Sequence, residues 1–273
     1  MGFICPVCGE NLIESEKSYS CCHAHLFDKA KKGYVNLLLG RDASLHGDSK
    51  EMALARYDIM QSGTYAPVKN AVIALLQTYA PAARVIADCG CGEGYYTAAI
   101  AEAFRQAEVL GTDISKEVLA VAKRRGNGFK RAVASSFALP LASDSCDVAL
   151  NIFSPFAKEE YARIIQPGGF LLMVIPLEYH LWELKQAVYE KPYLNEPHIP
   201  ALAGFSLAAQ ERLEYQKTLP SRQLIDLFGM TPYAIKTSPA DKEKLNAVSA
   251  LKITFSVQLL LYQKENEPWI TKK

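Results

Sequence analysis

The sequence contains no long hydrophobic run, almost no excess charge of either sign, and only two tryptophans. No apolar segment approaches the roughly 20 residues that a membrane helix needs. No early stretch joins basic residues to an apolar run, as an export signal does. The seven cysteines are an odd number, and without an export signal they indicate reduced thiols or metal ligation instead of disulfides. These absences predict a cytoplasmic protein without a membrane partner.

The net charge of +1 gives the chain no electrostatic signature of a nucleic-acid-binding protein. Basic clusters occur at residues 29–32, 123–125 and 130–131, but each is explained more simply as solvated charge on surface helices and turns. Charge therefore leaves the partner open. A length of 273 residues predicts about two domains, and a hydrophobic share of 49% is that of an ordinary globular protein.

Four of the seven cysteines gather near the N-terminus, in CPVCGENLIESEKSYSCCHAH (5–25). Two residues separate Cys5 from Cys8, a spacing that lets both thiolates point at one metal ion. Two further ligands would come from Cys21, Cys22, His23 and His25. Cys21 with His25 closes a tetrahedral site comfortably, and Cys22 with His25 is also sterically allowed. Four such ligands leave no open position, so the pattern predicts structural zinc, with a group of reduced structural thiols as the alternative.

Beyond a polar stretch at 40–51, which we interpret as a linker, the pattern is that of alternating strands and helices. Two helices are expected within 51–78, interrupted near 62–67. Strands are predicted at 83–90, 107–113, 129–135, 146–154 and 170–176, and helices at 95–106, 115–125 and 158–166. The fifth strand follows Pro167-Gly168-Gly169, which should end the preceding helix. This alternation is typical of an α/β fold with a doubly wound, Rossmann-like parallel sheet. A late strand at 250–264 could be antiparallel at the sheet edge.

The segment ADCGCGEGYYT (87–97) is the most informative part of this alternating region. Asp88 ends a strand, and Gly90, Gly92 and Gly94 follow at every second position before a helix. Glycines there allow a sharp turn and let a ligand lie against bare peptide groups. Asp113 ends the next strand, where a carboxylate can accept hydrogen bonds from both hydroxyls of a ribose. The alternative is a glycine turn in an α/β sheet without a ligand.

The glycine spacing and the local charge distinguish two nucleotide-like ligands. Dinucleotide-binding loops read G-x-G-x-x-G and place a pyrophosphate on a helix N-terminus. This chain has G-x-G-x-G, and the carboxylates of Asp88 and Glu93 would repel a pyrophosphate. They suit a sulfonium and an α-ammonium group. The loop therefore favours S-adenosylmethionine.

The D-x-G-x-G-x-G loop and the later acidic strand end resemble the class I S-adenosylmethionine-dependent methyltransferases over roughly residues 83–176. In that family the loop cradles the methionine part of the cofactor and the second acidic residue holds the ribose. The resemblance implies the second role for Asp113. It implies the first for the loop residues Asp88, Gly90, Gly92, Glu93 and Gly94. Ser135 and Ser136 stand where the third strand would flank the adenine.

The acceptor is less clear from the sequence. NIFSPF (151–156) follows the fourth strand, where the substrate normally lies, but it departs from the (N/D)PP(Y/F) motif of exocyclic-amine methyltransferases. No cysteine lies between 147 and 273, so C5 methylation of a pyrimidine through a cysteine nucleophile is unlikely chemistry for this chain. Direct transfer to a nitrogen or oxygen remains, in which the enzyme mainly aligns the nucleophile. His180 could face the same pocket or simply cap a helix.

Over nearly its whole length the chain resembles the ribosomal large-subunit RNA guanine-N1 methyltransferases. The shared segments are Phe27-Asp28, KKGYVNLL (31–38), the loop at 88–97, VASS--LP (133–140), HL-ELK (180–185) and MTP (230–232). The resemblance implies methyl transfer to N1 of a guanine in a 23S rRNA hairpin, and a homodimer. It implies zinc ligation by Cys5, Cys8, Cys21 and His25, and further cofactor contacts from Tyr65 and His180.

This resemblance divides the chain into a zinc-binding domain (1–36), a linker with helices (37–82) and a methyltransferase domain (83–273). The zinc ribbon would dock nucleic acid, or serve stability alone. Loss of the guanine N1 proton requires a base, and no residue is a convincing one; Glu178 and Asn151 are the nearest by position. Two other functions stay open: a methyltransferase of a small molecule or protein, and an RNA-binding protein without catalysis.

Overall fold

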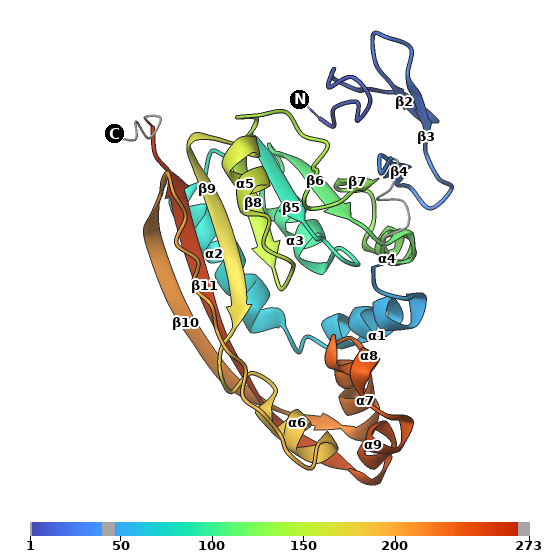
Figure 1. Ribbon diagram of the computed structural model, residues 1–273, viewed down its shortest axis with the longest axis vertical. Coiled ribbons are helices and arrows are strands. Elements are labelled where there is room, and N and C mark those ends of the chain that lie inside the picture. Colours follow the sequence, from blue (N-terminus) through green and yellow to red (C-terminus); the bar gives the residue numbers. More distant parts are fainter. Residues whose placement is uncertain (1, 40–46, 267–273) are drawn as a thin grey trace.

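The computed structural model describes residues 2–39 and 47–266, and a mixed sheet of eight strands forms its centre (Figure 1). The spatial order is β10-β11-β9-β8-β5-β6-β7-β4. The strands are β4 (Val35–Asn36), β5 (Val85–Cys89), β6 (Glu108–Asp113), β7 (Lys130–Val133), β8 (Cys146–Ile152), β9 (Ile165–Pro176), β10 (Phe205–Pro220) and β11 (Ala250–Lys264). Neighbours from β4 to β9 are parallel, whereas β11 and β10 are antiparallel additions. The predicted doubly wound α/β sheet is confirmed.

Helices cover both faces of the sheet. The helices of the described residues are α1 (Lys50–Gln61), α2 (Ala66–Tyr79), α3 (Tyr95–Ala103), α4 (Lys116–Ala122), α5 (Lys158–Ile164), α6 (Trp182–Val188), α7 (Ser221–Gly229), α8 (Tyr233–Lys236) and α9 (Pro239–Glu243). Short 3-10 helices lie at η2 (Lys123–Arg125) and η3 (Lys244–Ala247). Strand alternation divides the core: Ile86 joins the apolar cluster with α2 and α3, whereas Val85 and Ala87 join the cluster with α5.

The two helices predicted within 51–78 are present as α1 and α2. Ser49 begins α1, because its hydroxyl accepts a hydrogen bond from the Met52 N–H at 3.3 Å. Pro67 lies in the first turn of α2, where its missing N–H has no cost. Most of the linker predicted at 40–51 lies outside the described residues, since the structure describes none of 40–46.

The N-terminal segment folds as a small antiparallel sheet of β1 (Ile13–Glu14), β2 (Ser18–Ser20) and β3 (Leu26–Asp28). Its apolar side chains have no separate core. Phe3, Leu12 and Tyr19 belong to the same buried cluster as the β5 residue Ala87. The Ile4 N–H donates to the Pro140 carbonyl at 2.9 Å, and the segment then continues into β4, which pairs with β7. The ribbon is thus packed onto the large sheet.

Three expectations about the strands were wrong or incomplete. β9 begins at Ile165, so Pro167-Gly168-Gly169 lies within an irregular strand and not in the turn before it. The Ile165 backbone is already extended, which ends α5 two residues early. β11 is not at the edge, because β10 pairs along its outer side. β10 was not predicted; most of its residues are exposed or half-buried, so its sequence carries little apolar periodicity.

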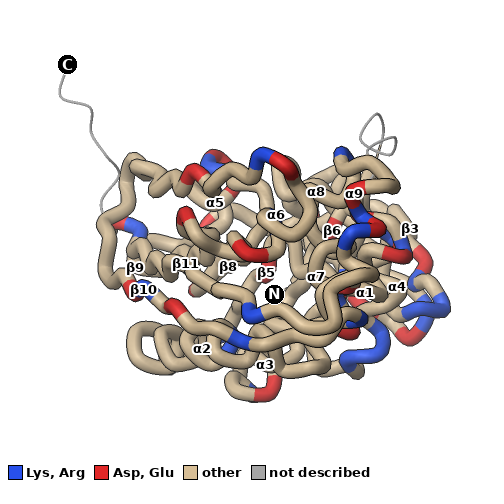
Figure 2. The backbone as a smooth tube through the Cα atoms, turned by 90° about the horizontal axis from the view of Figure 1, so that it is seen from below, with Lys and Arg blue, Asp and Glu red and all other residues tan. Residues whose placement is uncertain are grey.

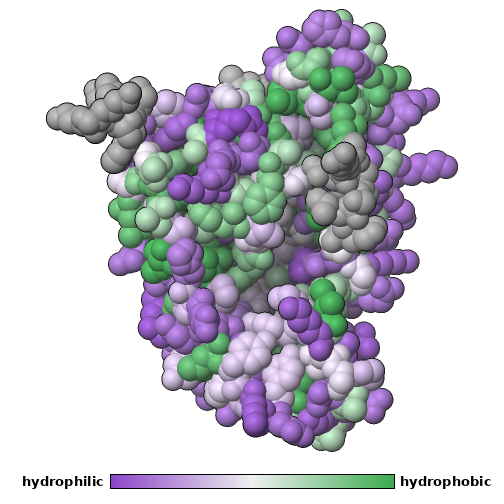
Figure 3. Space-filling model, viewed as in Figure 1, coloured by the Kyte–Doolittle hydropathy of each residue, from purple (hydrophilic) through white to green (hydrophobic). Residues whose placement is uncertain are grey.

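The surface view in Figure 3 shows apolar side chains on the ribbon at the upper right, and Val7, Ile13 and Leu26 there are exposed. Figure 2 shows lysine and arginine segments gathered beside α4 and β3. No helix in the described part of the chain is long and apolar enough to cross a membrane.

Candidate zinc and cofactor sites

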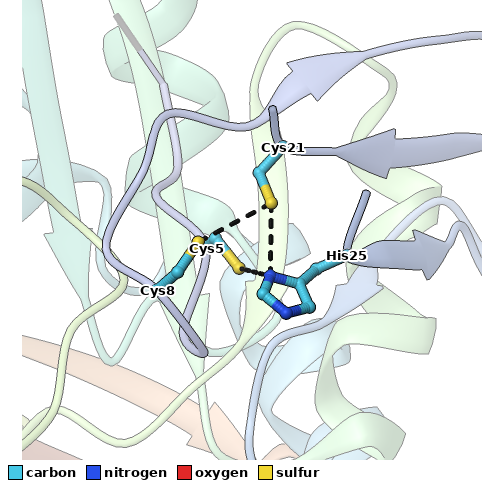
Figure 4. Close-up of side chains that lie close together, drawn as sticks. All are labelled: Cys5, Cys8, Cys21 and His25. Carbon is cyan, nitrogen blue, oxygen red and sulfur yellow. Dashed lines mark hydrogen bonds between the residues drawn. The ribbon is translucent and has the colours of Figure 1, made fainter. Parts of the chain in front are cut away.

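The predicted zinc ligands Cys5, Cys8, Cys21 and His25 point toward one another (Figure 4), and their ligand atoms all lie within 4.8 Å of each other. The sulfurs of Cys8 and Cys21 are 3.7 Å apart. Nδ1 of His25 lies 3.5 Å from the Cys5 sulfur and 3.3 Å from the Cys21 sulfur. Tetrahedral zinc with bonds of about 2.3 Å to sulfur and about 2.0 Å to nitrogen would separate its ligands by roughly 3.5–3.8 Å. The group therefore fits zinc closely.

Two tight turns bring these ligands together. The Gly9 N–H donates to the Cys5 carbonyl at 2.8 Å, and Gly9 adopts φ 77°, which favours glycine. The Ala24 N–H donates to the Cys21 carbonyl at 3.0 Å. Cys22 is exposed on the outside of its turn, so the spare ligand that its spacing allowed lies apart from the group.

The glycine loop follows β5, and each of its glycines lies close to a different neighbouring side chain. A Cβ on Gly90 would come within 2.6 Å of the Ser154 Cβ, and a Cβ on Gly94 within 2.7 Å of the Phe129 ring. Both have positive φ, 89° and 81°. These two glycines therefore permit close packing inside the protein. Gly92 lies against the Arg56 side chain from α1.

Asp113, at the end of β6, holds the glycine loop in place through its carboxylate. One carboxylate oxygen accepts the Gly92 N–H at 3.0 Å and the other accepts the Ser115 N–H at 2.9 Å. Burial raises the pKa of this carboxyl, and these two hydrogen bonds oppose the rise. A carboxylate offers about four acceptor positions, so capacity for further hydroxyl donors remains.

Asp88, at the end of β5, is buried and accepts the Thr97 hydroxyl at 2.5 Å. Burial raises its pKa to about 7, and the nearby Asp113 charge adds to the effect. Thr97 on α3 was not expected at this site, although it lies within the quoted motif. An ionised Asp88 needs positive charge nearby, which the cationic groups of S-adenosylmethionine carry.

Glu93 differs from the other acidic residues of the loop. Its carboxylate is buried and pairs with the Arg125 guanidinium at 2.7 Å. Burial raises the pKa of Glu93, and the Arg125 charge opposes the rise. Arg125 also lies over the Tyr57 ring at 4.2 Å from its centroid. The ion pair joins the loop to η2 and engages the carboxylate that we expected to face the ligand.

Tyr65 and His180 are brought together although 115 residues separate them. The Ser256 N–H donates to Nδ1 of His180 at 3.3 Å, so the ring proton of the neutral histidine is on Nε2. Nε2 in turn lies 3.4 Å from the Tyr65 hydroxyl oxygen. Burial, reinforced by the Lys185 charge, lowers the pKa of His180 to about 3. His180 is therefore neutral at physiological pH and is a buried donor instead of a surface cap.

The remaining candidates have structural partners. The Asn151 amide nitrogen donates to the Ser154 hydroxyl, the Tyr161 hydroxyl and the Pro155 carbonyl at 2.8–3.0 Å, which fixes the NIFSPF turn. Ser135 accepts the Phe137 N–H at 3.2 Å. Glu178 is exposed after β9. Asn151 thus fixes the turn that follows β8.

Two residues at this edge were missed from the sequence. Arg56 on α1 lies against the loop at Gly92, and the Phe153 ring packs against His180 and Tyr65. No local pattern could identify Arg56, because the contact joins elements 36 residues apart. Phe153 lay within a quoted segment, and its position after β8 was the available signal.

Comparisons with known proteins agree with this geometry. Residues 3–39 match a family model described as "RlmA, N-terminal", and residues 86–169 match one described as "Methyltransferase domain". A relative from Streptomyces fradiae, a "23S rRNA (guanine(748)-N(1))-methyltransferase", is 33% identical over 270 residues, covering 93% of this chain and 95% of its own length. The chain belongs to the 23S rRNA (guanine-N1)-methyltransferase family.

A second relative from another organism supports the same family. "Putative 23S rRNA (guanine-N(1)-)-methyltransferase YxjB" of Bacillus subtilis is 31% identical, covering 96% of this chain and 97% of its own length. Among solved structures, a geranyl diphosphate C-methyltransferase from Streptomyces coelicolor has a TM-score of 0.44 at 12% identity, covering 71% of this chain and 76% of its own. Family membership implies S-adenosylmethionine as cofactor and structural zinc, and the residues at both sites fit these groups.

Proposed function

We propose that this protein transfers the methyl group of S-adenosylmethionine to N1 of a guanine in a 23S rRNA hairpin. One observation carries the proposal. A zinc ribbon with four ligands packs into the same core as the sheet that bears the glycine loop, and Asp113 holds that loop through the Gly92 N–H. Relatives that extend over almost the whole chain are named for this reaction.

The chain's own residues have distinct tasks in this proposal. Cys5, Cys8, Cys21 and His25 bind zinc, which leaves no coordination position for chemistry. Asp113 holds the ribose, and the loop from Asp88 to Gly94 holds the methionine part, with Tyr65 and His180 closing the pocket. S-adenosylmethionine supplies an activated methyl group when bound. The protein would align guanine N1 with that methyl, so that the N1–CH3 bond forms as the S–CH3 bond breaks, leaving S-adenosylhomocysteine, while the N1 proton passes to water.

We propose that the RNA binds to the ribbon and to a neighbouring basic surface formed by Lys31, Lys32, Lys123 and Arg124. Lys31 and Lys32 end the ribbon with exposed side chains, and the Lys123 ammonium donates to the Lys31 carbonyl at 2.9 Å. Arg124, also exposed, continues this surface on η2. Clustered cations of this kind bind phosphates without regard to sequence. We further propose that the enzyme is a homodimer and acts in the cytoplasm.

The test is methylation of unmodified 23S rRNA with labelled S-adenosylmethionine, followed by primer extension. N1-methylguanine blocks the Watson–Crick edge, so reverse transcriptase should stop at a single guanine. Transfer to a protein or small molecule but not to RNA would select the alternative enzyme. Absence of transfer to every substrate, with RNA still bound, would select the non-catalytic RNA-binding protein. Sedimentation of the purified protein tests the dimer.

A further inference from the structure

Phe153 is the first residue after β8 and has an unusual backbone. Its φ is 53°, in the left-handed region that non-glycine residues rarely occupy. This conformation costs free energy and persists only where surrounding contacts impose it. The Phe153 N–H still donates to the Val174 carbonyl at 3.1 Å, so the strand pairing with β9 continues up to the turn.

The turn at Phe153 is held by hydrogen bonds of the next residue, Ser154, to the end of β5 and to β8. The Ser154 hydroxyl donates to the Cys89 carbonyl at 2.8 Å and accepts the Asn151 amide at 2.8 Å. Gly90 leaves the space that Ser154 fills. The turn that aims Phe153 and the loop proposed to hold S-adenosylmethionine are therefore locked to one another.

The Phe153 ring is held on one side and open elsewhere. It stacks on His180 with centroids 5.8 Å apart and an interplanar angle of 25°. The Tyr65 ring meets it edge to face at 6.0 Å and 77°. Despite these two contacts the residue is 39% exposed. Because His180 is neutral and buried beneath it, the ring presents an apolar flat surface at the carboxyl edge of the sheet.

We propose that the Phe153 ring is the platform on which the target guanine stacks, one face against the ring, beside the transferred methyl group. The proposal rests on the function proposed above and assigns its base subsite. A purine has a large π-face, and a base taken out of its stack regains stacking on an aromatic side chain. The left-handed backbone at Phe153 serves this role, because it directs the ring outward although the preceding residues of β8 are buried.

The experiment separates the ring from the turn. Phe153→Tyr and Phe153→Trp keep an aromatic face, Phe153→Leu keeps only apolar bulk, and Phe153→Asn suits the left-handed backbone without a ring. For each variant, kcat/KM for 23S rRNA is measured together with the Kd for S-adenosylmethionine and the melting temperature. Tyr79→Leu is the matched control, because Tyr79 is 40% exposed and lies at the far end of α2.

Loss of base stacking is expected to lower kcat/KM about ten-fold or more in the Leu and Asn variants. The Tyr and Trp variants should keep most of the activity, all four should bind S-adenosylmethionine as the wild type does, and Asn should melt no lower. Full activity in Phe153→Asn or Phe153→Leu would overturn the stacking role. A wild-type enzyme that methylates no rRNA would instead refute the proposed function itself.

Discussion

At the scale of single residues, the glycine loop combines buried carboxylates with two flanking arginines, Arg125 and Arg56. The Asp113 carboxylate accepts hydrogen bonds from the Gly92 and Ser115 N–H groups, and the Arg56 side chain of α1 lies against Gly92. The acidic members could be predicted, because they lie within a few residues of strand ends. Arg56 could not, since only the folded packing of α1 brings it to the loop.

Arg56 gives the prediction that belongs to this scale. Its guanidinium pairs with Asp48 and donates to the Met230 carbonyl at 3.3 Å, so it is already held in place. In the proposed cofactor site, the methionine carboxylate of S-adenosylmethionine would be an anion within reach of this cation. Arg56→Gln should raise the Kd for S-adenosylmethionine about ten-fold by calorimetry, the effect expected for one charged hydrogen bond.

Two comparisons make the Arg56 result specific. Arg56→Lys keeps the charge and should recover part of the affinity, although it cannot reproduce the planar fork. Arg222→Gln removes an exposed cation whose ion pair, among the described residues, is with Asp226 of the same helix, and it should leave the Kd unchanged. An unaltered Kd in Arg56→Gln would remove Arg56 from the cofactor site.

At the scale of elements, the strands that could be predicted from the sequence are those with the most buried residues. β5 and β8 are almost wholly buried, as are the central residues of β6 and residues 171–174 of β9, and these apolar runs made the strands recognisable. β10 escaped notice because it pairs on one side only and exposes most of its residues. β4 is only two residues long, and it pairs with β7 residues that lie 97 positions further along the sequence, as in Val35 with Ala132.

The ribbon yields a prediction about zinc and the whole fold. Because its core residues share a cluster with the large sheet, Cys5→Ser should lose zinc and also lower the melting temperature of the entire chain. Structural zinc supplies on the order of 10 kcal/mol of folding free energy in isolated fingers. RNA methylation should be lost, whereas S-adenosylmethionine should still bind below the unfolding transition.

Cys22→Ser is the matched control for this substitution. Cys22 is exposed and lies apart from the ligand group, so zinc content, measured by atomic emission, and the melting temperature should stay at wild-type values. Zinc loss in Cys22→Ser would mean that Cys22 replaces Cys21 as ligand. Loss of cofactor binding in folded Cys5→Ser would mean that the ribbon supports the glycine loop directly.

At the scale of the whole molecule, burial of Asp88 makes stability depend on pH. Its pKa rises from 3.8 to about 7 in the folded protein, so the folded state retains a proton that the unfolded state releases. Stability from this group is complete below about pH 4 and falls as pH rises towards 7. A shift of about three pKa units corresponds to about 4 kcal/mol at most.

Asp88→Asn isolates this contribution, since an amide oxygen can still accept the Thr97 hydroxyl. Urea unfolding of both proteins at several values between pH 4 and pH 8 gives the difference in free energy of unfolding. The wild type should lose stability relative to the variant as pH rises, by a few kcal/mol over that range. Parallel profiles would show that Asp88 ionises freely in the folded protein.

The position of β11 has a consequence for the order in which contacts form during synthesis. It is the last strand among the described residues, yet it lies between β9 and β10 and contacts two of the proposed cofactor residues: the Phe255 and Tyr65 ring centroids are 5.3 Å apart, and the Ser256 N–H donates to His180. During synthesis, the contacts around Tyr65 and His180 therefore cannot form until residues 250–264 have left the ribosomal exit tunnel.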